Sequence, residues 1–348
     1  MSSDQLEQTE AAATIMRLMN GAWIARIVHT AAEIGVVDHL DDQPRDAQWV
    51  AAASGTHAPS LARLLRALAA LGIVQETDQL QYTLTPLGAA LRADAPGSMR
   101  GWARMILSEM DERPWQALTH AVRTGDYAFR HAFGTDAWSY RAAHPDNSRL
   151  FDEAMRSMTE SVNAAVATSY PFNEFGWIVD VGGGNGALLL AILAKNPQTR
   201  GTVYELPHVA PHARERVAAS DVSVRCDVME GDAMTSVPAG ADAYVVKGVI
   251  HGRSDDQTVT ILSNCRTAMP PNGKLLLVER LMPERVDPEN ARARVNLLVD
   301  INMMLMAHGG RERREAEHRH LIARAGLQVS RILQTSSPMA IIEAVREG

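Results

Sequence analysis

Apolar and polar positions change their spacing about halfway along this 348-residue chain. Up to about residue 165, apolar side chains recur at intervals of three and four, as in Leu61, Leu64 and Leu68, which predicts amphipathic helices. Beyond that point, short β-branched runs alternate with helical stretches, which predicts a parallel sheet with helices on both faces. The predicted strands cover residues 178–181, 202–205, 223–228, 243–247 and 274–279.

The first hundred residues predict a winged-helix module. Residues 49–56 and 60–71 have the pattern of two helices joined by a turn, and residues 72–85 that of a short hairpin. One interpretation is DNA binding through Arg63 and Arg66; the other is an apolar module that packs against a second copy of the chain. The alanine and leucine content of the helices favours the second interpretation, a homodimer without nucleic acid.

Length and composition favour a two-domain globular protein. We expect a dimerisation domain over 1–100, connecting helices over 101–165, and an α/β domain over 166–348. The net charge of -7 argues against a nucleic-acid-binding surface. No apolar run reaches membrane-spanning length, the first residues are polar, and two cysteines form no disulfide framework, so we expect a cytoplasmic protein without membrane contact.

A glycine-rich turn over residues 182–186 joins the strand at 178–181 to the helical run at 187–194. Residues without a Cβ let the backbone at a helix N-terminus approach a ligand closely, which indicates a nucleotide-type cofactor. The turn also satisfies the dinucleotide pattern G-x-G-x-x-G/A, and Glu205 follows at the distance expected for an acid that holds a ribose. The turn alone therefore leaves a dinucleotide and S-adenosylmethionine (SAM) both open.

Further charged residues stand at the carboxyl ends of the predicted strands, where open α/β sheets bind ligands. Lys247 ends the fourth strand, His251 follows it, and Glu279 closes the fifth. Glu312 lies in a loop that enters a helix. A lone histidine is more often an ordinary polar residue, but an imidazole flanked by two carboxylates can be held in one tautomer and supported as a cation.

This ordered set, with the segments 114–118, 122–125 and 151–155, resembles the metal-independent, SAM-dependent O-methyltransferases of small molecules. That family includes plant caffeic-acid-type enzymes and bacterial enzymes that tailor polyketides, anthracyclines and phenazines. The resemblance covers nearly the whole chain and implies transfer of a methyl group from SAM to a hydroxyl of a small aromatic molecule, leaving S-adenosylhomocysteine. It also implies a Rossmann-like domain with a mainly parallel seven-stranded sheet over 166–348, and an acceptor pocket to which residues 101–165 contribute. It implies that His251 is the base and that Glu279 and Glu312 are the acids beside it.

The resemblance also implies two sets of binding residues. Those for the cofactor are Asp180, Gly182, Gly183, Gly184, Glu205, Leu206, Gly231, Asp232, Ala233, Met234, Lys247, Arg253 and Thr159. Those for the acceptor are Trp102, Trp115, Met155, Met158, Met303, Met304 and His308, although methionines at helical spacing are more often plain core. Asp300 is expected to support the helix that carries the later members of this set.

The chain departs from the family pattern at one place. Where the family usually has His-Asp-Trp, this sequence has His251, Gly252 and Arg253. Arg253 can stack on adenine in place of the aromatic ring or contact an acidic substrate. The departure leaves open a SAM-binding enzyme that does not methylate, such as a hydroxylase, decarboxylase or pericyclase. A winged-helix regulator that senses SAM is a more remote alternative.

Overall fold

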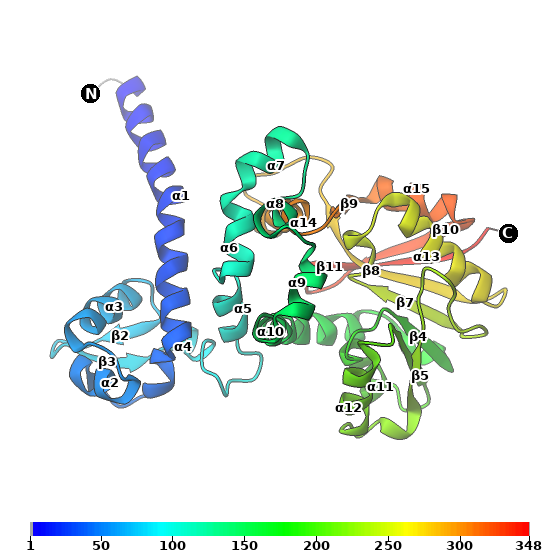
Figure 1. The fold of residues 1–348 in the computed structure, drawn as a ribbon, viewed down its shortest axis with the longest axis horizontal. Coiled ribbons are helices and arrows are strands. Elements are labelled where there is room, and N and C mark those ends of the chain that lie inside the picture. The colour runs from blue at the N-terminus through cyan, green and yellow to red at the C-terminus, as the bar shows by residue number, and fades with distance from the viewer. Residues whose placement is uncertain (1–2, 348) are drawn as a thin grey trace. The chain divides into compact units, whose positions relative to one another are not determined.

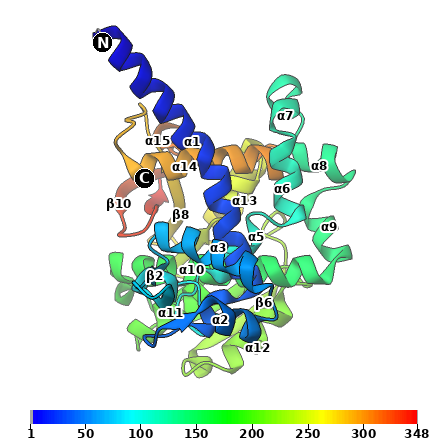
Figure 2. The same cartoon turned by 90° about the vertical axis from the view of Figure 1, so that its left-hand side faces the viewer.

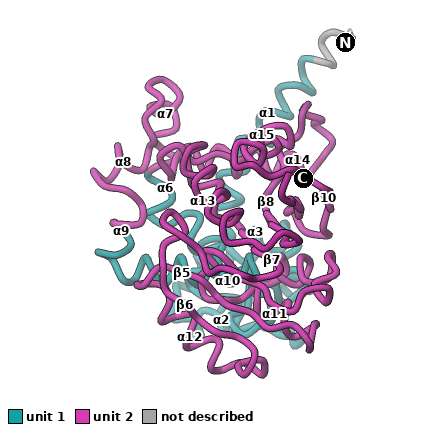
Figure 3. Tube along the Cα trace, turned by 90° about the vertical axis from the view of Figure 1, so that its right-hand side faces the viewer, with its two compact units in different colours: residues 1–113, 141–159 teal, residues 114–140, 160–348 magenta. Residues whose placement is uncertain are grey.

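The computed structural model describes residues 3–347. Contacts divide the chain into two compact units, which Figure 3 draws in different colours. One comprises Met1–Arg113 and Arg141–Thr159, and the other comprises Pro114–Tyr140 and Glu160–Gly348. Among the helices of the described part, none combines the length and apolar character that a membrane span requires.

The first unit opens with one long helix and a small winged-helix module. Helix α1 spans Ser3–Ile34 and is followed by η1 (Val36–His39), β1 (Arg45–Asp46), α2 (Ala47–Ser54), α3 (Ala58–Ala70), β2 (Val74–Glu76), β3 (Gln81–Leu84) and α4 (Pro86–Ala89). The strands form an antiparallel sheet in the order β1-β3-β2. Helix α2 begins where the Asp46 carboxylate accepts a hydrogen bond from the Trp49 amide, and it ends at Gly55 in the left-handed conformation. The predicted pair of helices and the hairpin are confirmed.

Helix α1 leaves apolar side chains in solvent. Its N-terminal turns extend away from the rest of its own unit in both views (Figures 1 and 2). The exposed side chains there include Ile15, Met16, Leu18, Met19 and Trp23. Towards its C-terminal end, α1 instead packs on α5 (Arg100–Met105), and Ala31 and Ala32 are buried in the core of the winged-helix module.

The remaining helices of the first unit lie later in the chain. Helices α6 (Glu109–Gln116), α9 (Ala137–Ala143) and α10 (Pro145–Ser169) each cross a boundary between the two units. Gly101 on α5 lies against α10, since a Cβ there would stand 2.9 Å from the Ala154 backbone nitrogen. A glycine at this position therefore lets the two helices approach closely.

The second unit is built on a mostly parallel sheet with strand order β10-β11-β8-β7-β4-β5-β6 (Figure 1). The strands are β4 (Trp177–Val181), β5 (Arg200–Glu205), β6 (Cys226–Glu230), β7 (Ala243–Lys247), β8 (Lys274–Met282), β10 (Leu327–Gln334) and β11 (Met339–Arg346). Strands β4 to β8 pair in parallel, whereas β10 and β11 are antiparallel. The expected seven-stranded Rossmann-like sheet is confirmed, with a short β9 (Arg313–Arg314) added beside β8.

Two predicted strands need a correction. The sequence places the end of one strand at Glu279, but β8 continues to Met282, so Glu279 lies inside it. The β-branched run at residues 223–228 predicted a strand from Ser223, but Ser223–Arg225 forms a 3-10 turn and β6 begins only at Cys226. The side chain of Val224 is 93% exposed, so this valine gains nothing from pairing inside the sheet.

Alternate residues of the strands enter two separate apolar layers. Ile178, Val245 and Leu276 belong to one buried cluster, together with side chains of α10, α11 (Ala187–Lys195) and α12 (Ala210–Ala218). Their immediate neighbours Val179 and Val246 belong to another cluster, together with α13 (Asp255–Ala268) and α15 (Glu315–Arg324). Burial on both faces explains why the strands are nearly continuous apolar runs.

Three further helices of the second unit pack together. Helices α7 (Leu118–Thr124) and α8 (Ala128–Phe133) contact α14 (Ala291–Met306), and Ala121, Ala128 and Leu305 are buried between them. Because α14 follows β8 and precedes the loop to β9, this packing fixes the segment that leads to Glu312.

Candidate active site

The glycine-rich turn connects β4 to α11 at the carboxyl end of the sheet. Gly182 and Gly184 adopt φ angles of 67° and 58°, which residues with a side chain rarely adopt. A Cβ on Gly182 would lie 2.8 Å from the Val249 side chain, whereas a Cβ on Gly184 would meet nothing within 4 Å. The Gly184 amide donates a 2.9 Å hydrogen bond to Glu205, which links the turn to the end of β5. The turn therefore presents open backbone over residue 184.

Two side chains of opposite charge lie near this turn, a buried Asp180 and a partly buried Lys247. Asp180 on β4 is 2% exposed, and burial raises its pKa to about 7, while the positive charge of Lys247 opposes that rise. Burial lowers the pKa of Lys247, against the attraction of Asp180 and Glu279. One oxygen of Asp180 is buried without a hydrogen-bond partner among the described residues. The arrangement leaves a buried acceptor for a polar ligand group.

The ends of β5 and β6 carry the other predicted cofactor residues of this unit. Glu205 also accepts from the Leu206 amide at 2.7 Å, and Asp232 accepts from the Met234 amide at 2.8 Å. A Cβ on Gly231 would overlap the Tyr204 hydroxyl, at 2.0 Å, so only glycine fits there. The Ala233 carbonyl accepts from Asn264 on α13. The fold thus brings the turn, Glu205 and residues 231–234 to the same edge of the sheet.

His251 lies in the short helix η4 (Ile250–Gly252) after β7, and its ring contacts two buried carboxylates. Its Nδ1 stands 3.2 Å from Oε1 of Glu312 and 3.8 Å from Oε2 of Glu279. The His251 side chain is 27% exposed, whereas both glutamate side chains are 1% exposed. The second oxygen of Glu279, Oε1, accepts from the Ile250 amide at 3.2 Å. The structure therefore brings the three predicted catalytic side chains together.

The protonation of this cluster follows from its surroundings. Burial disfavours a charged His251 ring, but the hydrogen bond to Glu312 and the negative charges of Glu279 and Glu312 outweigh it and raise the pKa of His251. Burial raises the pKa of Glu279 to about 7, and the charge of His251 opposes that rise. A donor on Nδ1 facing Glu312 leaves Nε2 as the proton acceptor in the neutral ring.

Two supporting residues, Asp300 and Arg280, hold Glu312 in place, and the sequence analysis named only Asp300. Asp300 on α14 accepts from the Glu312 amide at 2.8 Å. Arg280 on β8 places Nε 3.9 Å from Glu312 and donates to Asn296 at 3.2 Å. Asp300 was expected to support its helix, and here it supports the loop after that helix. The one sequence signal for Arg280 is its position directly after Glu279, at the end of an apolar strand.

The same three side chains have a spacing that a metal ion can also use. One ligand atom from each of His251, Glu279 and Glu312 lies within 4.8 Å of the others. The sequence alone offered no compact set of such ligands, and the fold assembles one. The positive charge of the Arg280 guanidinium beside Glu312 opposes the binding of a cation here.

The predicted acceptor residues of the second unit lie along and beside α14. Trp115 donates from Nε1 to Asn302 at 3.0 Å, and Trp115 and Met304 pack on the small cluster around Leu305. Met303 also lies on α14, and the exposed His308 ring stands 5.7 Å from the Tyr127 ring. Trp115 and Met304 therefore have packing roles whether or not they contact an acceptor.

The other predicted residues, except Arg253, belong to the first unit. Trp102 lies on α5, and Met155, Met158 and Thr159 lie on α10, all partly buried. The Thr159 hydroxyl donates to the Met155 carbonyl at 2.7 Å, so the hydroxyl is hydrogen-bonded within its own helix. Arg253, in the second unit, is partly buried after η4, and its carbonyl accepts from Arg313 at 2.8 Å.

Comparisons with known proteins identify the class. Residues 115–328 match the O-methyltransferase domain family, and residues 16–94 match the O-methyltransferase dimerisation domain. The chain is 38% identical to the phenazine O-methyltransferase PhzM of Lysobacter antibioticus, over 95% of each chain. It is also 38% identical to the mitomycin biosynthesis 6-O-methyltransferase of Streptomyces lavendulae, over 96% of this chain and 94% of that one. The chain belongs to the SAM-dependent O-methyltransferases.

Solved structures agree with this assignment. The calicheamicin-biosynthesis methyltransferase CalO1, in its S-adenosylhomocysteine-bound form, superimposes with a TM-score of 0.87 at 34% identity and full coverage of both chains. The neocarzinostatin-biosynthesis O-methyltransferase NcsB1, in complex with SAM and 2-hydroxy-5-methyl naphthoic acid, gives 0.76 at 33% identity. It covers 93% of this chain and 96% of that chain.

Proposed function

We propose that this protein moves the methyl group of SAM to a hydroxyl of a small aromatic secondary metabolite, with His251 as general base and without a metal. The observation that carries the proposal is the contact of His251 Nδ1 with Glu312 at 3.2 Å, beside Glu279 at 3.8 Å. Two nearly buried carboxylates on one side of an imidazole orient the ring and stabilise its positive charge.

The proton transfer follows from this geometry. A phenol with a pKa of about 10 is protonated at neutral pH and is a poor nucleophile until a base takes its proton. With Nδ1 bonded to Glu312, the free Nε2 of His251 accepts that proton, and the negative charges of Glu312 and Glu279 stabilise the resulting imidazolium. When bound, SAM supplies an electrophilic methyl group, and its transfer to the acceptor oxygen leaves S-adenosylhomocysteine.

The residues at the sheet edge fit SAM by their chemistry. The open backbone at Gly184 provides room for the methionine part, and the buried oxygen of Asp180 is an acceptor beside the turn. Glu205 keeps lone pairs for ribose hydroxyls in addition to its two amide bonds. Asp232 with Ala233 and Met234 would hold the adenine, and Lys247 completes the wall. We assign Arg253 to the cofactor side, where its guanidinium stacks on a flat ring.

The remaining parts of the proposal concern the acceptor, the domains and the assembly. The partly buried methionines and tryptophans named above suit a flat aromatic acceptor, because thioethers pack well on rings.

We keep the functional division at 1–100, 101–165 and 166–348, with the first segment as the dimerisation domain of a homodimer that does not bind nucleic acid. The exposed apolar face of α1 supports the dimer. A cytoplasmic location suits the two buried free cysteines.

The direct test uses methyl-labelled SAM and a panel of hydroxylated phenazines and naphthoates. Wild-type enzyme should transfer label to an oxygen of at least one member and release S-adenosylhomocysteine. H251A should lower kcat by at least about 100-fold while calorimetry finds SAM binding unchanged. H212A, which removes an exposed histidine of α12, serves as the matched control and should keep full activity. Wild-type turnover by H251A would disprove the base assignment.

Two further readouts separate the alternatives. Conversion of an acceptor without release of S-adenosylhomocysteine would identify a SAM-bound enzyme of another reaction class. Treatment with a chelator should leave the rate unchanged, because the proposed steps use only side chains and SAM. A rate that falls with the chelator and returns with one divalent metal would instead assign the His251, Glu279 and Glu312 cluster to that metal.

A further inference from the structure

Arg313 is the largest side chain among the fully buried residues, and the proposed reaction does not use it directly. It lies in β9, beside the end of β8, and its side chain is 1% exposed. Burying a guanidinium is costly unless every donor is bonded, so such a residue is expected to have a complete set of partners. In this structure its partners lie in the segment that carries His251.

The guanidinium of Arg313 binds two backbone carbonyls on either side of His251. Its Nη1 donates to the Ile250 carbonyl at 2.8 Å, and its Nη2 donates to the Arg253 carbonyl at 2.8 Å. The backbone amide of Arg311 donates to the carbonyl of His251 itself, also at 2.8 Å. Three carbonyls between residues 250 and 253 are therefore tied to residues 311–313, which include Glu312.

Asp255 completes this clamp. Its Oδ1 accepts from Nε and Nη2 of Arg313 at 3.1 and 2.9 Å, and both of its oxygens accept from Arg311. Burial acts to raise the pKa of Asp255, but the bonds to Arg313 and Arg311 outweigh it and lower the pKa. A negative charge at this position, in the first turn of α13, also suits the helix dipole.

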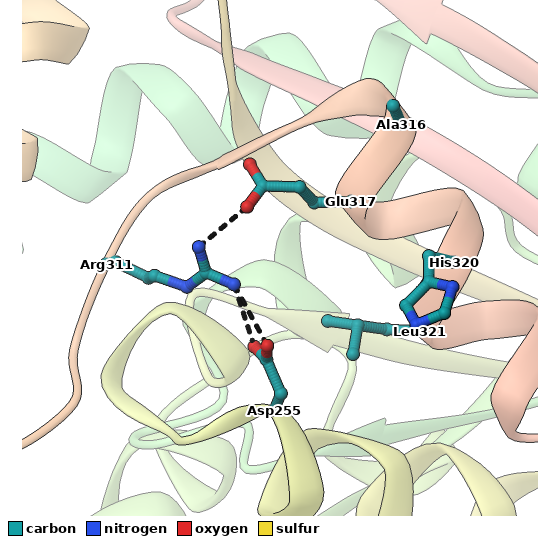
Figure 4. Close-up of a pocket in the computed structure, with 6 residues that line it drawn as sticks. All are labelled: Asp255, Arg311, Ala316, Glu317, His320 and Leu321. Atoms are coloured by element: carbon teal, nitrogen blue, oxygen red, sulfur yellow. Dashed lines mark hydrogen bonds and ion pairs between the residues drawn. The ribbon is translucent and has the colours of Figure 1, made fainter.

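The outer side of the clamp is a surface hollow of about 310 Å³ lined by Asp255, Arg311, Ala316, Glu317, His320 and Leu321 (Figure 4). Arg311 spans it from Asp255 to Glu317, at 2.6 Å from Glu317 Oε1. Since these charges already pair with one another, the hollow braces the loop and we assign it no ligand.

We propose that Arg313 is a positioning residue that sets the bond between His251 and Glu312 by clamping their two segments together. This role rests on the proposed function of His251 as the base. Arg313 itself contacts neither cofactor nor acceptor in this assignment. The charged groups that face the His251 ring are Glu279, Glu312 and Arg280. Loss of the clamp should lengthen the contact with Glu312, so that burial dominates and the pKa of His251 falls.

The decisive variant is R313K, because lysine keeps the positive charge but cannot bond both carbonyls and Asp255 in the planar geometry of arginine. NMR of ¹⁵N-histidine-labelled protein, with H251A used to assign the signal, should place the titration of His251 at lower pH in R313K than in wild type. With the acceptor that gives the fastest turnover in the panel, kcat should fall by about 10- to 100-fold. The acidic limb of its pH profile should move to lower pH.

The matched control is R324K on α15, where Arg324 forms an exposed ion pair with Asp256. It should leave the His251 titration and kcat at wild-type values. An unchanged His251 titration in R313K, with only a lower melting temperature, would overturn the proposal and leave Arg313 as a purely structural residue. If R313K does not fold, D255N is the second test, because it removes part of the clamp at a partly exposed site. An unchanged His251 titration in D255N would also overturn the proposal.

The NMR readout separates this inference from the proposed function. A shifted His251 titration in R313K together with full turnover by H251A would keep the clamp and reject the base. An unshifted titration together with loss of turnover in H251A would reject the clamp and keep the base.

Discussion

The winged-helix region and the carboxyl edge of the large sheet differ in which side chains they expose and which they bury. Between residues 8 and 91, the buried side chains of the described structure are apolar or aromatic, while α1 exposes Leu18 and Trp23 to solvent. At the sheet edge, Asp180, Glu279 and Arg313 are each no more than 2% exposed. One region therefore leaves apolar surface uncovered, and the other buries ionisable groups.

Both features, the exposed apolar side chains and the buried ionisable groups, lower the stability of an isolated chain. Exposed apolar side chains forgo hydrophobic burial, and buried charges lose hydration that their partners only partly replace. The proposed function accounts for both exceptions. In the proposed dimer a second copy covers the apolar face of α1, and in the proposed reaction the buried acids stabilise the positive charge on His251.

The largest effect should come from breaking this link between buried charge and chemistry. E312Q keeps the shape of the side chain but removes the charge that accepts from His251 Nδ1. We expect kcat to fall by about 100-fold and the acidic limb of its pH profile to move to lower pH, because the raised pKa of His251 depends on Glu312. Wild-type kcat would mean that the buried acids are structural only. Rate measurements between about pH 5 and pH 9 bracket the ordinary pKa of histidine and check this result.

A charge placed on the apolar face of α1 tests the other half of the comparison. Trp23 is 71% exposed in the single chain, so W23E should cost an isolated chain little. In a dimer that buries this tryptophan, the same change should weaken association by at least about 30-fold, as at an interface hot spot. Light scattering after size exclusion measures the mass. V224E in the second unit, where Val224 is 93% exposed, is the control and should leave the mass unchanged.

Buried acids should also make folding stability depend on pH. The folded pKa of Asp180 is raised to about 7 from 3.8, so between these values the folded chain holds a proton that the unfolded chain has lost. Stability should then fall as pH rises through this window, by up to about 1.4 kcal/mol per pH unit from this group. D180N should flatten the dependence in denaturant titrations at about pH 5 and pH 6.5, and a slope equal to wild type would contradict the buried assignment.

The sequence predicts many of the helices and strands well because their apolar residues recur at a regular spacing, and the strands of the central sheet are apolar on both faces. The strand cores at Ile178 and Leu276 are apolar on both faces, and the glycines at 182 and 184 mark the turn where φ becomes positive. Strand ends carry less information. The β-branched Val224 resembles a strand residue, yet it is exposed in a 3-10 turn, because its neighbours decide the pairing.

The sequence indicates which residues come together near the carboxyl edge of the sheet, but it does not indicate the residues that hold them through tertiary contacts. His251 and Glu279 meet because β7 and β8 are parallel neighbours, and Glu312 joins them from the loop before β9. Nothing in spacing indicates that Arg313 reaches back across 60 residues to the carbonyls around His251, or that Asp300 holds the Glu312 amide. Such bonds depend on loop packing, which leaves no periodic signal.

The smallest effect is expected at the winged-helix module, where the comparison also distinguishes dimerisation from DNA binding. Arg63 is exposed on α3, and Arg66 pairs with Glu76 on β2 at 3.5 Å with 70% of its side chain exposed. Such a surface pair contributes at most about 1 kcal/mol, so R66A should leave the melting temperature nearly unchanged.

Changing both Arg63 and Arg66 to alanine should also leave methyl transfer intact. Fluorescence anisotropy with duplex DNA at low salt should detect no binding to wild type that these changes abolish, because the net charge of -7 opposes approach to phosphates. Salt-dependent binding lost in the double variant would instead assign this surface to nucleic acid and leave only α1 for the dimer.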